Sequence, residues 1–142
     1  MKPIVFAALA FALAACSSTP SWLGGGEEKA VDPNIFPADY RREILDTMRS
    51  TLTDVNKVRD AGISDPQLVA IDQEQRYAVC VRANSRDEYG RYPGPKDRIG
   101  YFYGGHITQL IDAKPEQCAR AAYKPFPELE QLCIGKGCAK PR

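Results

Sequence analysis

Cysteine and histidine are the side chains of this sequence best suited to chemistry, and they number five and one. The last four cysteines (Cys80, Cys118, Cys133 and Cys138) have 37, 14 and 4 residues between them. A zinc site of four thiolates normally takes its ligands from two short paired loops, which these intervals do not provide. A Cys-x-x-Cys redox motif is also missing. The spacing therefore predicts structural disulfides and no metal site.

The first cysteine follows an apolar N-terminal segment. Lys2 precedes an apolar run that is shorter than the roughly 20 residues needed to span a bilayer and that ends in Leu13-Ala14-Ala15-Cys16. This pattern resembles the bacterial lipoprotein signal, which is cleaved just before a diacylated cysteine. The resemblance implies that residues 1–15 are a removed signal peptide and that Cys16 carries palmitate-type acyl chains. The alternative is an ordinary secretory signal, which would be removed as well.

A lipoprotein signal also implies a location. Ser17 stands where an aspartate in enterobacterial lipoproteins favours the inner membrane, so we expect a lipid-anchored protein on the periplasmic face of the outer membrane. Residues 16–32 are rich in Ser, Gly and Pro and are predicted to be a lipidated flexible tether. Residues 33–142 are predicted to form a single periplasmic domain.

Export would place the remaining four cysteines in an oxidising compartment, where an even number favours two disulfides. Three pairings are open to four cysteines. We favour Cys80–Cys118, which would join a strand to a helix across the core. The other pair would then be Cys133–Cys138, where the glycines between the two cysteines allow a tight backbone.

His106 is the remaining candidate for catalysis. It follows Gly104-Gly105, where the backbone is open to a ligand, and Asp112 could lie nearby. The alternative is a half-buried, hydrogen-bonded histidine in a strand, and we favour it. Nucleophile-elbow, zinc-protease and phosphate-loop motifs are missing from the sequence. We therefore expect no catalytic residue and no cofactor.

Residues 84–98 are predicted to be a long polar loop, and residues 86–98 within it are the most suggestive surface, because long loops in compact domains are often functional. Tyrosine and arginine are enriched at protein interfaces. The alternative is a solvated hairpin tip with core tyrosines beneath it. The candidate partner surface comprises Tyr89, Arg91, Tyr92, Arg98, Tyr101 and Tyr103.

Hydrophobic periodicity predicts the elements that position these residues. Apolar side chains recur at helical spacing over residues 40–55, after the start signal of Pro37 and Asp39. Residues 76–83 are rich in β-formers, and residues 99–111 form a second strand with a bulge at the glycine pair. Residues 68–71 could add a short strand, residues 115–123 a second helix, and Pro127 a final turn. The expected fold is α+β: an antiparallel sheet of two or three strands, packed with two main helices and stapled by disulfides.

This order of elements resembles the C-terminal domain of TolA, a relative of the TonB C-terminal domain. There too a strand cysteine pairs with one in an alanine-rich helix that leads into a Pro-x-Pro stretch. The matching residues here are Cys80, Cys118, Ala119, Ala121, Ala122, Pro125 and Pro127. The resemblance implies partner binding by strand addition or surface docking. The chain also resembles small uncharacterised lipoproteins of alphaproteobacteria.

Composition limits the function further. The chain has 142 residues, enough for one ordinary domain, and 19 basic against 18 acidic side chains. This balance argues against nucleic-acid binding, which normally needs a basic excess. We therefore expect a non-catalytic, membrane-anchored envelope lipoprotein that docks a periplasmic or outer-membrane protein or supports envelope integrity. The alternative is a small-ligand-binding or hydrolytic lipoprotein that uses His106 and the glycine pair.

Overall fold

The computed structural model describes residues 30–135, and residues 31–135 belong to one compact unit. Within the described range no helix is long and apolar enough to cross a membrane. The elements in chain order are α1 (Tyr40–Thr51), β1 (Arg59–Ile63), β2 (Gln67–Ile71), β3 (Glu74–Asn84), β4 (Lys96–Tyr103), β5 (His106–Asp112), α2 (Pro115–Cys118), β6 (Lys124–Pro125) and α3 (Pro127–Glu130).

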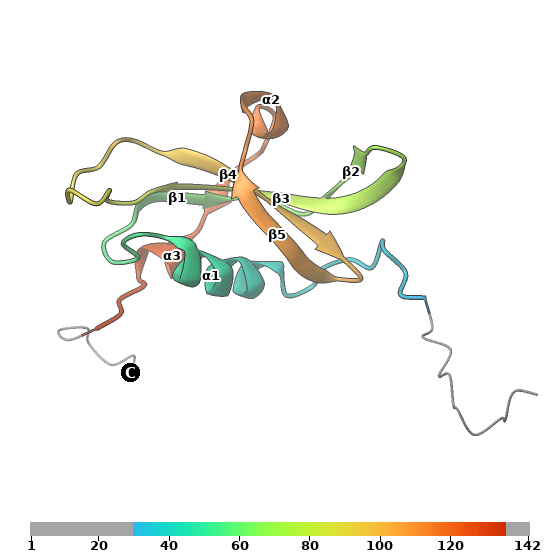
Figure 1. Cartoon of the computed structure of the whole chain (residues 1–142), viewed down its shortest axis with the longest axis horizontal. Helices are drawn as coiled ribbons and strands as arrows, with labels where there is room; N and C mark the ends of the chain where they lie inside the picture. The colour runs from blue at the N-terminus through green and yellow to red at the C-terminus, as the bar shows by residue number, and fades with distance from the viewer. Residues whose placement is uncertain (1–29, 136–142) are drawn as a thin grey trace, which may run out of the picture. The chain divides into compact units, whose positions relative to one another are not determined.

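The strands of the described chain form one antiparallel sheet in the order β5-β4-β3-β1-β6. β3 is its central strand and is 11 residues long. One half of β3 pairs with β1, and the other half pairs with β2 on the same side. Figure 1 shows α1 and α3 on one face of this sheet and α2 on the other.

β3 separates two apolar clusters, because successive strand residues point to opposite faces. Val79 and Val81 face the larger cluster, which α1 and α3 cover. Ala78 and Cys80 face a smaller cluster beneath α2. Burial on both faces explains why this strand reads as a nearly continuous apolar run.

α1 packs through Ile44 and Met48, which are four residues apart and almost fully buried. Gly100 lets the helix approach β4 closely, because an added Cβ there would lie 3.1 Å from the Cδ1 atom of Ile44. The helix predicted over residues 40–55 is therefore confirmed as far as Thr51, and its predicted continuation to residue 55 is wrong. The helix ends at Thr51, where the following residue, Leu52, takes an extended conformation.

The predicted fold class is wrong in its sheet and in its helices, and the glycine pair explains much of the error. Gly104 and Gly105 have φ values of 58° and 85°, and Tyr103 pairs with His106. Two successive positive φ angles are the geometry of a tight hairpin turn and not of a bulge within one strand. Residues 99–111 therefore belong to two strands, β4 and β5.

The sheet gains further strands between residues 59 and 71. β2 contains the predicted short strand at residues 68–71 and joins β3 through a tight turn in which Asp72 has a φ of 55°. β1 escaped prediction because Asp60, with a φ of 53°, lies where its register with β3 shifts between Arg59 and Gly62. An irregularity of this kind interrupts the alternation that marks a strand.

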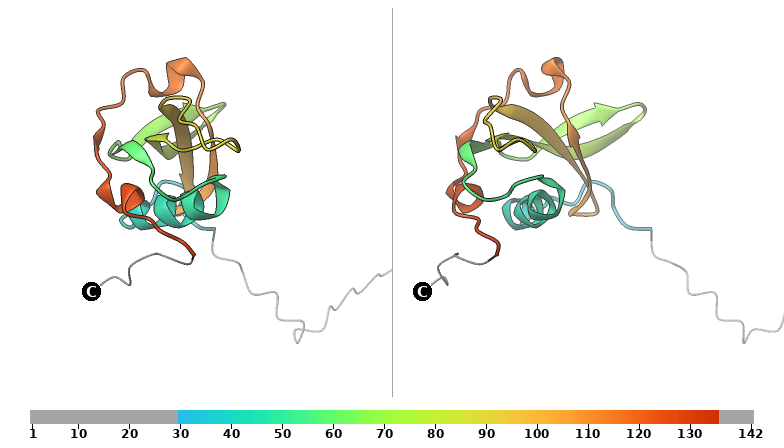
Figure 2. Two further views of the ribbon diagram at one scale, coloured as in Figure 1. Left: turned by 90° about the vertical axis from the view of Figure 1, so that its left-hand side faces the viewer. Right: turned by 60° about the vertical axis from the view of Figure 1, so that its left-hand side comes forward.

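The second predicted main helix, residues 115–123, is also wrong, since α2 ends at Cys118. α2 and α3 cover opposite faces, so the chain between them must pass the edge of the sheet (Figure 2). Extended chain covers about 3.3 Å per residue against 1.5 Å in a helix. Lys124 and Pro125 make this passage as β6, paired with β1. The final turn predicted at Pro127 is confirmed as α3.

Candidate functional site

The loop of residues 85–95 joins β3 to β4 and is braced from within by Asp87. One carboxylate oxygen of Asp87 accepts hydrogen bonds from the backbone N–H groups of Tyr89 and Arg91, both at 2.9 Å. The other oxygen pairs with the guanidinium of Arg91 at 3.2 Å. Gly90 closes the turn with a φ of 72° and donates to the Asp87 carbonyl. An aspartate that bonds the backbone ahead of it stabilises a turn of this kind.

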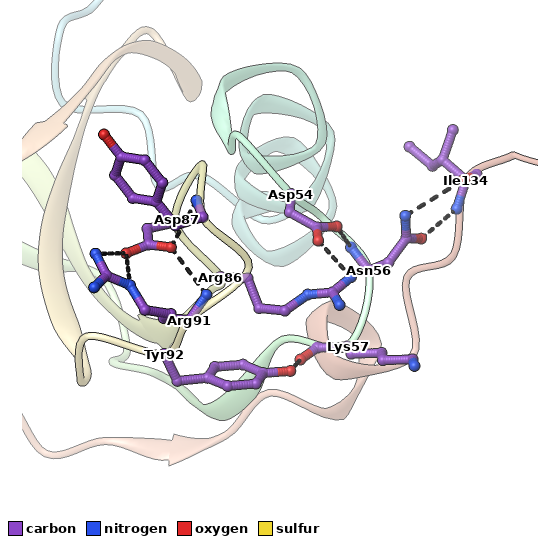
Figure 3. Close-up of polar contacts among 9 residues, drawn as sticks. Asp54, Asn56, Lys57, Arg86, Asp87, Arg91, Tyr92 and Ile134 are labelled. Atoms are coloured by element: carbon purple, nitrogen blue, oxygen red, sulfur yellow. Dashed lines mark hydrogen bonds and ion pairs between the residues drawn. The ribbon is translucent and has the colours of Figure 1, made fainter.

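The same loop is tied to the segment that follows α1 (Figure 3). Arg86 forms an ion pair with Asp54, and the hydroxyl of Tyr92 donates to the carbonyl of Lys57 at 2.6 Å. The guanidinium of Arg59 lies over the Tyr92 ring, 4.0 Å from its centre. These contacts join residues more than 30 positions apart in sequence. They hold the base of the loop in one place.

The carboxylates of Asp87 and Asp54 are both held in their charged forms. Hydrogen bonds from the backbone of Arg91 and then of Tyr89 hold the pKa of Asp87 below its usual range. A backbone hydrogen bond from Asn56, followed by the guanidinium of Arg86, lowers the pKa of Asp54. The two carboxylates therefore remain acceptors at neutral pH.

The tip of the braced loop presents an aromatic and a cationic side chain. Tyr89 is 71% exposed, and the guanidinium of Arg91 lies 5.0 Å from the centre of its ring. Tyrosine and arginine are among the side chains enriched in the residues that carry most of the binding energy at interfaces. Because the Asp87 brace already orders the backbone beneath them, less conformational entropy is lost when a partner binds.

A polar cleft of 270 Å³ lies between this loop and the end of α1. Basic and acidic side chains share its walls, and this mixture suits polar groups of a partner better than an apolar ligand. Its lining residues include Leu52, Thr53, Arg86, Glu88, Lys96 and Arg98.

The structure divides the six predicted surface residues among separate places. Tyr89, Arg91 and Tyr92 lie together in the loop. Arg98 points to the α1 face, where it donates to Thr51 at 3.1 Å and pairs with Asp112 at 3.2 Å. It is thus tied to the scaffold beside the cleft.

The two strand tyrosines lie away from the loop tip. Tyr101 packs against the smaller cluster, and its hydroxyl accepts a hydrogen bond from Gln117 at 2.8 Å. Tyr103 lies at the far end of β4, beside the hairpin turn. The candidate partner surface is therefore reduced to the loop, with Asp54, Asn56 and Lys57 as supporting residues that sequence reasoning missed.

His106 occupies an exposed position at the start of β5. Its side chain is 82% exposed, and its Nδ1 lies 3.0 Å from Oε1 of Glu43 on α1. The expectation of a half-buried histidine is therefore wrong, whereas the expected hydrogen bond is present and joins His106 to Glu43. Asp112 lies at the opposite end of the strand and pairs with Arg98, so it does not assist His106.

The predicted Cys80–Cys118 disulfide is confirmed, and it joins β3 to α2. The predicted Cys133–Cys138 pair includes Cys138, which lies outside the described residues, as does the lipidation site Cys16. Among residues 30–135, no group of three or more His, Cys, Asp or Glu side chains is arranged to hold a metal ion.

No protein-family model, curated protein or solved structure matches this chain. The resemblances to bacterial lipoproteins and to the TolA C-terminal domain therefore stay predictions.

Proposed function

We propose that this chain is a non-catalytic envelope lipoprotein, anchored through Cys16 to the periplasmic face of the outer membrane, that docks a protein partner through the tip of the loop at residues 85–95. The observation that carries the docking role is the exposed Tyr89 on a backbone braced by Asp87. The residues at positions 13–16 support the anchor.

The loop has the features of a small hot spot. Tyr89 offers a large amphipathic ring, Arg91 offers a fork of donors, and the polar cleft beside them can take charged side chains of the partner. Truncation of a hot-spot residue typically costs about 2 kcal/mol or more, which is roughly a 30-fold loss of affinity. Tyr89→Ala is therefore expected to weaken partner binding by about 30-fold or more.

A photo-crosslinking amino acid at position 89 tests the docking role in living cells. The matched control carries the crosslinker at Arg42, whose side chain is 70% exposed on α1. A discrete protein adduct is expected at position 89 and not at position 42. Adding Asp87→Ala, which removes the brace, should weaken that adduct while the chain stays folded. Equal adducts at both positions, or none at position 89, would refute docking through this loop.

Metabolic labelling with palmitate tests the anchor independently. Label should enter the wild-type chain and not the Cys16→Ser variant, and the labelled chain should fractionate with the outer membrane. An unlabelled wild-type chain would refute the anchor without touching the docking loop.

A further inference from the structure

Apolar side chains gather at the end of the domain opposite the docking loop. Four of them form what we call the apolar collar: Val31 (53% exposed), Ile35 (46%), Phe36 (54%) and Tyr103 (39%). Three come from the segment that leads into α1, and the fourth ends β4. A contiguous exposed patch of this kind commonly marks an interaction site.

Contacts with the β4–β5 turn hold the collar together. Gly104 donates from its N–H to the carbonyl of Pro33, and a Cβ at Gly104 would lie 2.5 Å from Cγ1 of Val31. A Cβ at Gly105 would lie 3.1 Å from Cγ2 of Ile35. The two glycines therefore give the segment room to pack on the turn, as Figures 1 and 2 show for the path of residues 30–36.

Aromatic contacts complete the collar and give it a polar rim. The ring of Phe36 meets that of Tyr77 edge to face, with 5.4 Å between their centres. The hydroxyl of Tyr103 donates to the carbonyl of Val31 at 3.5 Å, and the guanidinium of Arg76 lies 5.3 Å from the centre of its ring. Aromatic residues with one polar end are enriched at the boundary between membrane and water.

We propose that the apolar collar rests in the interfacial layer of the membrane that holds the acylated Cys16, an inference that depends on the proposed lipid anchor. The point at which the tether enters the compact unit favours the membrane as the surface that contacts the collar. Only 14 residues separate Cys16 from Val31, where the compact unit begins. For the tether predicted from the sequence, a flexible chain of this length has a mean span of about 19–22 Å. Counted along the chain, the collar is thus the part of the compact unit nearest to the proposed lipid anchor.

Membrane contact at the collar would set the orientation of the whole domain. Ala83 pairs with Lys96 at the loop end of the sheet, while Tyr77 pairs with Phe102 close to the collar. β4 connects the two ends with eight residues, or roughly 26 Å at 3.3 Å per residue. The docking loop would therefore face away from the bilayer and stay accessible to a partner.

Fluorescence quenching by brominated lipid tests the collar in the acylated, mature chain. Trp22 is the only tryptophan of the sequence, so Trp22→Phe removes the tryptophan fluorescence of the chain, and a single tryptophan can then be introduced at a chosen position. Phe36→Trp places the reporter in the collar, and Tyr89→Trp places the matched control in the loop. The vesicles contain phosphatidylcholine and phosphatidylglycerol with brominated acyl chains. We expect at least a twofold loss of emission at position 36, relative to unbrominated vesicles, and no loss at position 89.

Two further results decide the proposal. Val31→Ser with Ile35→Ser in the Phe36→Trp chain should abolish the quenching while the melting temperature stays close to that of the parent, since both side chains are about half exposed. An acylated chain without quenching at position 36 overturns membrane contact and leaves the anchor standing, as expected if a protein or a second copy covers the collar. Equal quenching at positions 36 and 89 also overturns it. A chain that takes up no palmitate overturns the lipid anchor and, with it, the membrane contact of the collar, and leaves docking through the loop untouched.

Discussion

Removal of the Cys80–Cys118 disulfide should destabilise the domain strongly. The two cysteines are 38 positions apart, and the chain-entropy relation for a closed loop of that size gives about 4 kcal/mol. Both side chains are buried, with 7% and 3% exposure, so replacement by alanine also removes packed sulfur atoms. A small domain has only about 5–15 kcal/mol of stability in total. Cys80→Ala with Cys118→Ala should therefore bring the chain close to its unfolding threshold.

Urea unfolding followed by circular dichroism measures this loss. A chain with Cys16→Ser, Cys133→Ala and Cys138→Ala keeps Cys80–Cys118 as its only cysteine pair. Reduction of that pair breaks the crosslink and retains both sulfur atoms, so it isolates the crosslink from the packing. We expect reduction to lower the free energy of unfolding by about 3–4 kcal/mol, and the alanine pair to lower it further. A loss below about 1 kcal/mol on reduction would refute the view that this bridge restrains the unfolded chain.

Three other perturbations test the scaffold. Glu43→Ala removes the carboxylate that accepts the Ile107 backbone N–H at 2.7 Å. It should lower the free energy of unfolding in urea by about 1.5–3 kcal/mol and speed amide exchange at position 107. Glu43→Gln, which keeps an acceptor oxygen, should retain most of the stability. Gly100→Ala would place a methyl group 3.1 Å from α1 and should cost about 1–3 kcal/mol; an unchanged melting temperature would contradict close packing of α1 on β4. The hydrogen bond from Arg82 holds the pKa of Asp97 below its usual range, so the stability from this carboxylate is present above about pH 4 and is lost as the pH falls through its folded pKa. Asp97→Asn should make the melting temperature fall less steeply as the pH is lowered. A profile of melting temperature against pH that is unchanged in this variant would contradict the contribution of the Asp97 carboxylate to stability.

Short-range patterns predicted the parts of this fold that depend on neighbouring residues. Ile44 and Met48 recur at helical spacing, and the apolar run around Val79 is long enough for a buried strand. The disulfide from Cys80 to Cys118 was predicted for two reasons. An even number of cysteines in an oxidising compartment favours disulfides, and this pair would join a strand to a helix across the core. In each case the signal lies within one element or in a residue type with few alternatives.

The remaining features depend on backbone conformation or on distant partners. Gly104-Gly105 suits a bulge or a hairpin turn equally well in sequence, and pairing with β5 decides between them. The brace between Asp54 and Arg86 joins positions that no sequence period relates. The turn that begins at Asp87 and closes at Gly90 did carry a local signal, namely an aspartate followed three residues later by glycine. The loop could have been predicted as ordered from that pattern.

The hydrogen bonds between Asn56 and Ile134, near the end of the described chain, affect how a partner can be isolated. Its side-chain oxygen accepts the N–H of Ile134 at 2.8 Å, and its amide donates to the carbonyl of the same residue at 3.4 Å (Figure 3). The described part of the chain thus ends beside the segment that supports Tyr92. A bulky tag inserted directly after Gly135 would stand beside that segment and compete with a partner at the proposed binding tip for space. Isolation through antibodies against the untagged chain avoids that obstruction.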